Sequence, residues 1–290
     1  MFPVDPYAAG VMVAAAALPV AGNVYILAQH YGVAPARRHV METLSENRCF
    51  GGVQGVYKHA STSTGTDMTF ALFLPAEAQD GPVPVLWFLS GLTCTHENAM
   101  TKAGAQAWAA EHGIALVFPD TSPRGDGVPN DDAYDLGQEL PTLLDEHFAL
   151  DMERQSITGH SMGGHGALTL AMALPGRFCS VSAFAPICNP TNSEWGRKQF
   201  SAYWGEEANW GPHDATLLMQ GRGFDGPVLI DTGTDDQFGD KLGTEAFAAA
   251  MAAQRQEGQI RLQKGYDHSY FFISSFMEDH VAFHAEALYA

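Results

Sequence analysis

The sequence predicts one α/β domain with a mostly parallel central sheet that is covered by helices on both faces. Three observations carry this prediction. With 290 residues, of which 46% are hydrophobic, the chain can bury a large core without division into two domains. It contains short, almost wholly apolar segments, which are typical of parallel strands buried on both faces. These segments alternate with longer stretches that suit helices.

The predicted elements begin with two strands, at 52–61 and 67–75, in which apolar and polar residues alternate. Such alternation is typical of half-buried antiparallel strands, so we expect an opening hairpin. The later apolar segments predict parallel strands at 85–89, 114–118, 156–159, 180–186, 227–233 and 260–266. Between and after them we expect helices at 97–113, 139–148, 162–176, 241–258 and 274–290. This order of elements is typical of a doubly wound sandwich.

The first forty residues differ from the predicted domain, which we place at 41–290. Residues 8–28 contain no charged side chain and are about as long as a membrane span. A secretory signal is a poor match, because Asp5 and no Lys or Arg precede the stretch. Three interpretations stay open for 1–40: an extraneous or disordered extension, a membrane anchor, or a helix docked on the domain. If the stretch inserts into a membrane, Arg37 and Arg38 directly after it favour a cytoplasmic side for the predicted domain.

Composition excludes some functions. A formal net charge of -18 opposes binding to the phosphate backbone, which excludes nucleic acid as a partner. The four cysteines form no CxxC pair and no metal-ligand spacing, so we expect neither a disulfide scaffold nor a zinc site, and a reducing cytoplasm fits best. His280 and His284 lie four residues apart on the predicted last helix, and we interpret them as a solvated helix face rather than a metal site.

The segment Gly159 to Gly163 fits the pattern G-x-S-x-G between a predicted strand and a predicted helix. In an α/β-hydrolase fold this is the nucleophile elbow, a tight turn that needs small residues two positions before and after the serine. Gly159 and Gly163 meet that need. The pattern therefore predicts Ser161 as a nucleophile. The alternative is a glycine-rich structural turn, which would not require a serine at its apex.

The acid and the base of such an enzyme come after the nucleophile along the chain, on loops after later strands. His268 is the histidine that follows the last predicted strand and precedes the terminal helix, so we predict it as the base. Three aspartates crowd the turn at the end of the preceding strand, and only one can hold His268. These residues, which the pattern alone does not separate, are Asp231, Asp235 and Asp236.

The oxyanion hole is expected from two backbone N–H groups. One belongs to the residue after the nucleophile, here Met162, and the other to a loop after an early strand. Gly91 in SGLTCT permits an unusual backbone angle in that loop, so we predict the N–H of Leu92 as the second donor. Cys94 is either a small buried hydrophobic residue or a thiol close to the substrate.

Seven segments together resemble the S-formylglutathione hydrolases of the esterase D family, from Met41 to the C-terminus. They are METLSENRCFGGVQGVYKHAS, SGLTCTHEN, PDTSPRGDGVPNDDAYDLG, GHSMGGHGAL, FAPICNP, GTDDQF and GYDHSYFFI. The resemblance implies a cytosolic serine thioesterase without cofactor or metal, often a homodimer, that cleaves S-formylglutathione. It also implies Asp236 as the acid, and it places Cys94 and Trp195 near the substrate. Met41 becomes a second candidate for the start of translation.

The chain departs from the family pattern at two places. After Gln138 it lacks an aromatic-rich segment that lies near the active-site rim in the family. Ser193 and Glu194 stand where the family more often has a small residue and proline, and an acid there would disfavour an anionic substrate. We therefore keep two alternatives to the S-formylglutathione hydrolase: a general short-chain carboxylesterase, and an inactive hydrolase-like protein retained as a binding module.

Overall fold

The computed structural model describes residues 41–61, 66–121 and 140–290. The predictions for 1–40, with the apolar stretch 8–28, and for the segment after Gln138 lie outside these residues. Within the three ranges, none of the helices is long and apolar enough to cross a membrane.

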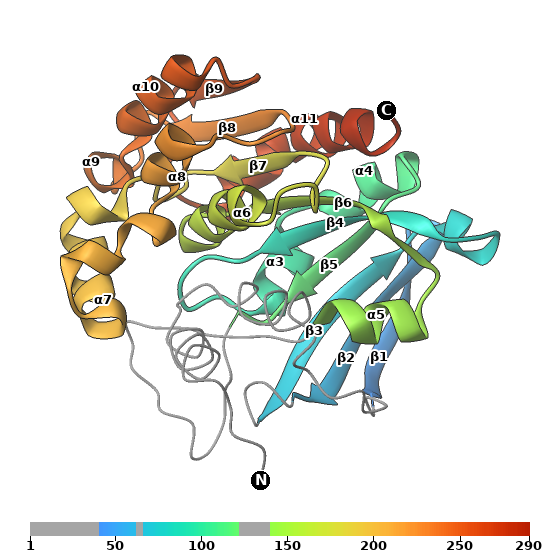
Figure 1. Cartoon of the computed structure of the whole chain (residues 1–290). Coiled ribbons are helices and arrows are strands. Elements are labelled where there is room, and N and C mark those ends of the chain that lie inside the picture. Colours follow the sequence, from blue (N-terminus) through green and yellow to red (C-terminus); the bar gives the residue numbers. More distant parts are fainter. Residues whose placement is uncertain (1–40, 62–65, 122–139) are drawn as a thin grey trace, which may run out of the picture.

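The predicted α/β architecture is confirmed, with a nine-stranded sheet in the described part of the chain (Figure 1). The strand order is β1-β2-β3-β5-β4-β6-β7-β8-β9. The pairs from β1 to β5 are antiparallel, and those from β5 onward across the sheet are parallel. The strands are β1 (Met41–Cys49), β2 (Gly52–Ala60), β3 (Asp67–Leu74), β4 (Val83–Leu89), β5 (Ala115–Pro119), β6 (Leu150–Gly159), β7 (Val181–Phe184), β8 (Val228–Gly233) and β9 (Gly258–Gln263).

Helices pack on both faces of the sheet, each over its own buried cluster (Figure 1). One face carries α5 (Leu140–His147), α6 (Met162–Ala173), α8 (Ala215–Gly221) and α10 (Thr244–Gln254). The other face carries α3 (His96–Lys102), α4 (Ala105–Glu111) and α11 (Tyr270–Leu288). Shorter connections contain α7 (Glu194–Trp204), α9 (Gly239–Leu242) and 3₁₀ turns at Ala76–Gln79, Pro190–Asn192, Glu207–Asn209 and Gly211–His213.

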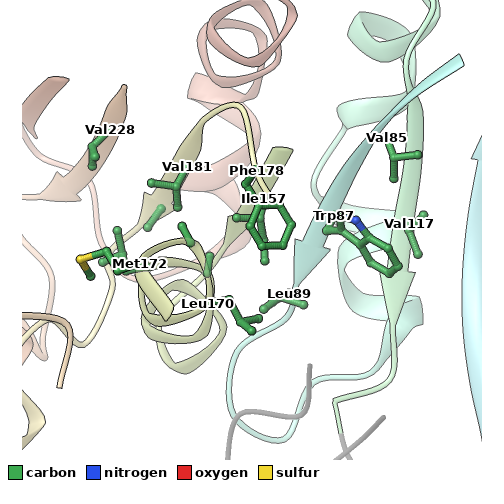
Figure 2. Close-up of a cluster of buried hydrophobic side chains, with 14 of the residues drawn as sticks. Val85, Trp87, Leu89, Val117, Ile157, Leu170, Met172, Phe178, Val181 and Val228 are labelled. Carbon is green, nitrogen blue, oxygen red and sulfur yellow. The ribbon is translucent and has the colours of Figure 1, made fainter. Parts of the chain in front are cut away.

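Strand β4 shows why a central strand can be apolar at every position. Val85, Trp87 and Leu89 point into the cluster under α6, which Figure 2 shows in close-up. Leu86 and Phe88 point to the opposite face and join the cluster under α11. Because successive side chains of a strand alternate between faces, a strand covered on both sides has no position that favours a polar residue.

The structure adds elements that the sequence pattern did not predict. Strand β1 pairs with β2 in the antiparallel sense, yet its side chains are exposed over most of its length, so it lacks the alternation of a half-buried strand. Helices α7 and α8 were also not predicted. Helix α11 begins at Tyr270, four residues before the predicted start, because the Ser269 hydroxyl caps it by accepting from the Phe271 N–H at 3.3 Å.

Two predicted helices are each broken in two, and a glycine stands at each break. Gly104, with φ of +70°, separates α3 from α4 inside the predicted helix 97–113. Gly243, with φ of +71°, separates α9 from α10 inside the predicted helix 241–258. A left-handed residue ends the helix before it, and glycine adopts this conformation without steric cost. Helix α10 then ends at Gln254, since Arg255 is also left-handed.

The interpretation of His280 and His284 as a solvated helix face was wrong. Both side chains are fully buried between α11 and the sheet. The two rings are hydrogen-bonded to Ser180, Ser182 and the carboxylate of Asp231 at 2.7 to 3.3 Å. Across the ranges that the structure describes, no group of three His, Cys, Asp or Glu side chains is arranged to hold a metal ion.

We predict that His284 makes the fold sensitive to acid. Burial, and then the neighbouring His280, hold the pKa of His284 well below its ordinary value of 6.5. The unfolded chain therefore takes up a proton below about pH 6.5 that the folded chain refuses, and the free energy of unfolding falls by about 1.4 kcal/mol per pH unit for this group. This contribution is complete above pH 6.5 and is lost on acidification.

The H284Q variant tests this prediction in urea unfolding at pH 7 and pH 5. At pH 7 it should lose about 2 kcal/mol, because glutamine cannot bond both Ser180 and Ser182 in the imidazole geometry. Between pH 7 and pH 5 its stability should fall less steeply than that of the parent protein. Equal slopes for the two proteins would contradict the prediction.

Candidate active site

Ser161 lies at the junction of β6 and α6 in a strained backbone conformation. Its φ is +56° and its ψ is -116°, a combination that non-glycine residues rarely adopt. The surrounding backbone holds it there. The Ser161 N–H donates to the Phe184 carbonyl at 2.9 Å, and its own carbonyl accepts from the His165 N–H at 2.9 Å. Such strain persists where neighbouring structure over-determines it, which is typical of functional sites.

The two glycines of the elbow are required by contacts with backbone atoms. A Cβ on Gly159 would collide with the carbonyl of Gly163. A Cβ on Gly163 would collide with the carbonyls of Leu89 and Ser90 at the end of β4. Both neighbours are main-chain atoms of packed elements, so they cannot move aside as a flexible side chain could. The turn therefore brings the predicted nucleophile against the carboxyl end of β4.

The structure brings His268 and Asp236 together. His268 Nδ1 lies 2.6 Å from Asp236 Oδ2, and the Phe238 N–H donates to Asp236 Oδ1 at 2.8 Å. The side chains of the other two candidate acids bind other partners. Asp231 is buried and pairs with Arg261 at 2.6 Å, while Asp235 accepts from the Thr234 hydroxyl at 3.0 Å. Of the three aspartates, Asp236 is therefore the one in contact with His268.

His160, which the sequence pattern did not single out, contacts the predicted base and adjoins the predicted nucleophile. Its ring packs against that of His268 with centroids 4.5 Å apart, and it directly precedes Ser161. Burial lowers the pKa of His160 to about 3, so its ring stays neutral at physiological pH. No hydrogen bond joins Ser161 directly to His268 in the described chain. In ligand-free enzymes such bonds are often long and shorten only with substrate.

The loop after β4 lies beside the elbow, where the second oxyanion donor is predicted. A Cβ on Gly91 would stand 3.5 Å from Ser161 Cβ and 3.1 Å from His160 Nδ1. The loop closes into a turn in which the Cys94 N–H donates to the Gly91 carbonyl at 3.1 Å. Leu92 stands inside that turn. Met162 is the first residue of α6, so its N–H is among the amides that a helix leaves unpaired.

Cys94 and Trp195 are each connected to the predicted base through intervening aromatic rings. Cys94 is half-buried and adjoins the hydroxyl of Tyr270, whose pKa is raised by burial and by this thiol. The Tyr270 ring packs against His160 at 5.9 Å. Trp195 packs against Phe238 at 5.0 Å, and Phe238 meets the His268 ring edge-on at 5.0 Å.

Sequence reasoning missed three aromatic residues that line this region: His160, Phe238 and Tyr270. The available signal was their position, since each stands within two residues of a predicted catalytic residue. Adjacent residues of a tight turn frequently contact the same group, and aromatic rings pack readily edge-on or tilted.

Comparisons with known proteins place this geometry in a family. The Esterase family model matches residues 61–283. The S-formylglutathione hydrolase of Paracoccus denitrificans (strain Pd 1222) is 60% identical over 273 residues, which cover 85% of this chain and 98% of that protein. The chain belongs to the S-formylglutathione hydrolase family. The S-formylglutathione hydrolase of Mus musculus is 44% identical, covering 86% of this chain and 99% of its own.

A solved structure agrees with this membership. The S-formylglutathione hydrolase of Agrobacterium tumefaciens superposes with a TM-score of 0.81 at 41% identity and covers 85% of this chain and 99% of its own. The alignment with the Paracoccus hydrolase runs over 273 residues although only 85% of this 290-residue chain takes part. That relative therefore has residues inside the aligned region that this chain lacks, in agreement with a deletion within the chain. The predicted place after Gln138 stays a prediction.

We predict that Gly163→Ala destabilises the elbow. Alanine normally stabilises a helix relative to glycine, but here its Cβ collides with the carbonyls of Leu89 and Ser90. The free energy of unfolding should fall by about 3 kcal/mol, as for a severe overpacking substitution. Gly81→Ala is the control, because a Cβ there meets nothing within 4 Å. Urea unfolding of both variants is the measurement, and equal stabilities would contradict the steric account.

Proposed function

We propose that this chain hydrolyses S-formylglutathione to glutathione and formate, with Ser161 as nucleophile, His268 as base and Asp236 as acid. One observation carries the proposal: the 2.6 Å contact between His268 and Asp236 beside a strained serine, in a chain 60% identical to an S-formylglutathione hydrolase. The three residues follow the chain order of α/β-hydrolases.

The reaction proceeds in two steps. In the first, Nε2 of His268 takes the Ser161 proton while the serine oxygen attacks the formyl carbon; the carbon–sulfur bond then breaks, and the glutathione sulfur leaves with that proton from His268. Asp236 holds the imidazole in the tautomer with the proton on Nδ1 and stabilises its cation. In the second step, neutral His268 takes a proton from the water that attacks the formyl-enzyme, and formate leaves as His268 passes this proton to the Ser161 oxygen.

Two features lower the barrier to this reaction. An ordinary thiol has a pKa of about 8.5, so the thiolate leaves with less help from His268 than an amine would need. The N–H groups of Leu92 and Met162 stabilise the negative charge that develops on the carbonyl oxygen, a contribution worth about 10² to 10³ in rate for each donor. Because a formyl group is small, bulky acyl esters should be poor substrates.

We also propose a cytoplasmic location. The four cysteines are all free thiols, which suits a reducing compartment. A homodimer remains a prediction from the family resemblance.

The proposal is tested by the ratio of kcat/KM for S-formylglutathione to that for 4-nitrophenyl acetate. We expect the thioester to be preferred, and Ser161→Ala to reduce both activities by at least about 10³. Preference for the aryl ester would favour a short-chain carboxylesterase. In that case, the loss of the residues that this chain lacks would have weakened its recognition of glutathione. Failure of an organophosphonate probe to label Ser161 would support the inactive alternative. Ser161→Ala activity within tenfold of the parent would remove Ser161 from the mechanism.

We predict that Asp236→Asn lowers kcat by about 10⁴, because asparagine stabilises the wrong imidazole tautomer. Asp235→Asn is the matched control, since Asp235 is exposed and its carboxylate accepts from Thr234 instead. That variant should keep kcat within about threefold. Steady-state kinetics on S-formylglutathione measure both. The assignment of the acid is wrong if the two variants exchange these effects.

A further inference from the structure

The turn that carries the predicted acid also carries a lysine, and the two are held rigidly together. The Phe238 N–H donates to the Asp236 side chain, and the Lys241 N–H donates to the Phe238 carbonyl at 2.8 Å. The next residue, Leu242, is fully buried, and its carbonyl accepts from the Cys188 N–H at 2.6 Å. Hydrogen bonds within this turn therefore hold the backbone of Lys241 close to Asp236.

Lys241 is linked to the base by a row of aromatic rings. Its Nζ lies 4.9 Å from the centre of the Trp195 ring. Trp195 packs against Phe238, and Phe238 packs edge-on against His268, each at 5.0 Å. A cation over an indole ring is attracted by the negative face of the ring. This contact positions the ammonium without neutralising its charge.

A second lysine is linked to His268 through a different pair of rings. Nζ of Lys102, at the end of α3, lies 6.0 Å from the centre of the Tyr270 ring. Tyr270 packs against His160, which packs against His268. Neither Lys102 nor Lys241 forms an ion pair with any residue that the structure describes.

These two cations beside the site contrast with the rest of the chain. The sequence has 33 Asp and Glu against 15 Lys and Arg, so the field of the whole protein repels anions. S-formylglutathione carries its thioester on the central residue and a carboxylate at each end, with an ammonium group beside one of the two carboxylates. Local positive charge would offset the repulsion between these carboxylates and a chain of net charge -18.

We propose that Lys241 and Lys102 bind the two carboxylates of S-formylglutathione, one on each side of the thioester. The inference rests on the proposed function and names two specificity-determining residues for it. Each lysine has a long flexible stem and a compact charge, so it can turn from its ring to a carboxylate that lies over the aromatic row. A neutral acyl ester would gain nothing from either lysine.

The test is a set of charge-neutralising variants measured with S-formylglutathione and with 4-nitrophenyl acetate. K241Q and K102Q should each raise KM for S-formylglutathione about fivefold, as expected for a partly exposed charge pair, and the double variant about 25-fold if the sites are independent. The kcat/KM ratio of thioester to aryl ester should fall by the same factors. K241R keeps the charge and should restore KM to within about twofold.

R222Q is the matched control for overall charge. Arg222 lies between the end of α8 and the start of β8, at the edge of the sheet opposite the carboxyl ends of the parallel strands. Its loss should change KM by less than about twofold. The proposal is overturned if R222Q raises KM as much as K241Q does, because the lysine then acts through general charge. It is also overturned if K241Q lowers kcat/KM equally for both substrates, because the lysine then acts through packing.

Calorimetric binding of S-methylglutathione separates this inference from the proposed function. Binding needs no turnover, so it can be measured even if the parent protein fails to hydrolyse S-formylglutathione. Such a failure would contradict the proposed function but not the carboxylate sites. We expect K241Q and K102Q each to raise the dissociation constant about fivefold. Unchanged affinity in both variants would overturn the carboxylate sites whatever the outcome of the kinetics.

Discussion

The strained turn at Ser161 is the constraint around which the rest of the site is arranged. A serine with φ of +56° needs compensation, and the Phe184 carbonyl, the first turn of α6 and two glycines supply it. The glycines let α6 start directly against the end of β4. As a result, the loop after β4 and the N-terminus of α6 meet at the serine, where two backbone amides can face the same oxygen.

The parallel pairing of β8 and β9 explains how distant residues reach this turn. Asp236 and His268 are 32 positions apart, yet each follows the carboxyl end of one of these neighbouring strands. Backbone bonds continue beyond the strands, since the Thr234 N–H donates to the Gln263 carbonyl and the Asp235 N–H to the Tyr266 carbonyl, both at 3.0 Å. The register of the sheet therefore fixes the distance between acid and base before any side chain contributes.

The sequence predicted the features that a local pattern encodes. Strands such as β4 were recognisable because burial on both faces leaves no polar position, and the elbow because its glycines and serine are adjacent. Strand β1 was not, because its exposed side chains show no alternation. Which of the three aspartates contacts His268 depends on partners far away along the chain, and so does the burial of His280 and His284. No local pattern contains that information.

Buried polar residues around Asp231 hold strand β8 in position. Asp231 accepts two bonds from Arg261 and lies 3.3 Å from His280, and its backbone carbonyl accepts from the Ala185 N–H at 2.7 Å. Burial opposes ionisation of Asp231, but bonds from His280 and Arg261 outweigh it and hold its pKa below the ordinary value. Apolar contacts alone would tolerate a small slip of β8 along β7, whereas these bonds would be broken by one. Since β8 leads directly to Asp236, a polar cluster that adds little stability by itself can still fix where the acid stands.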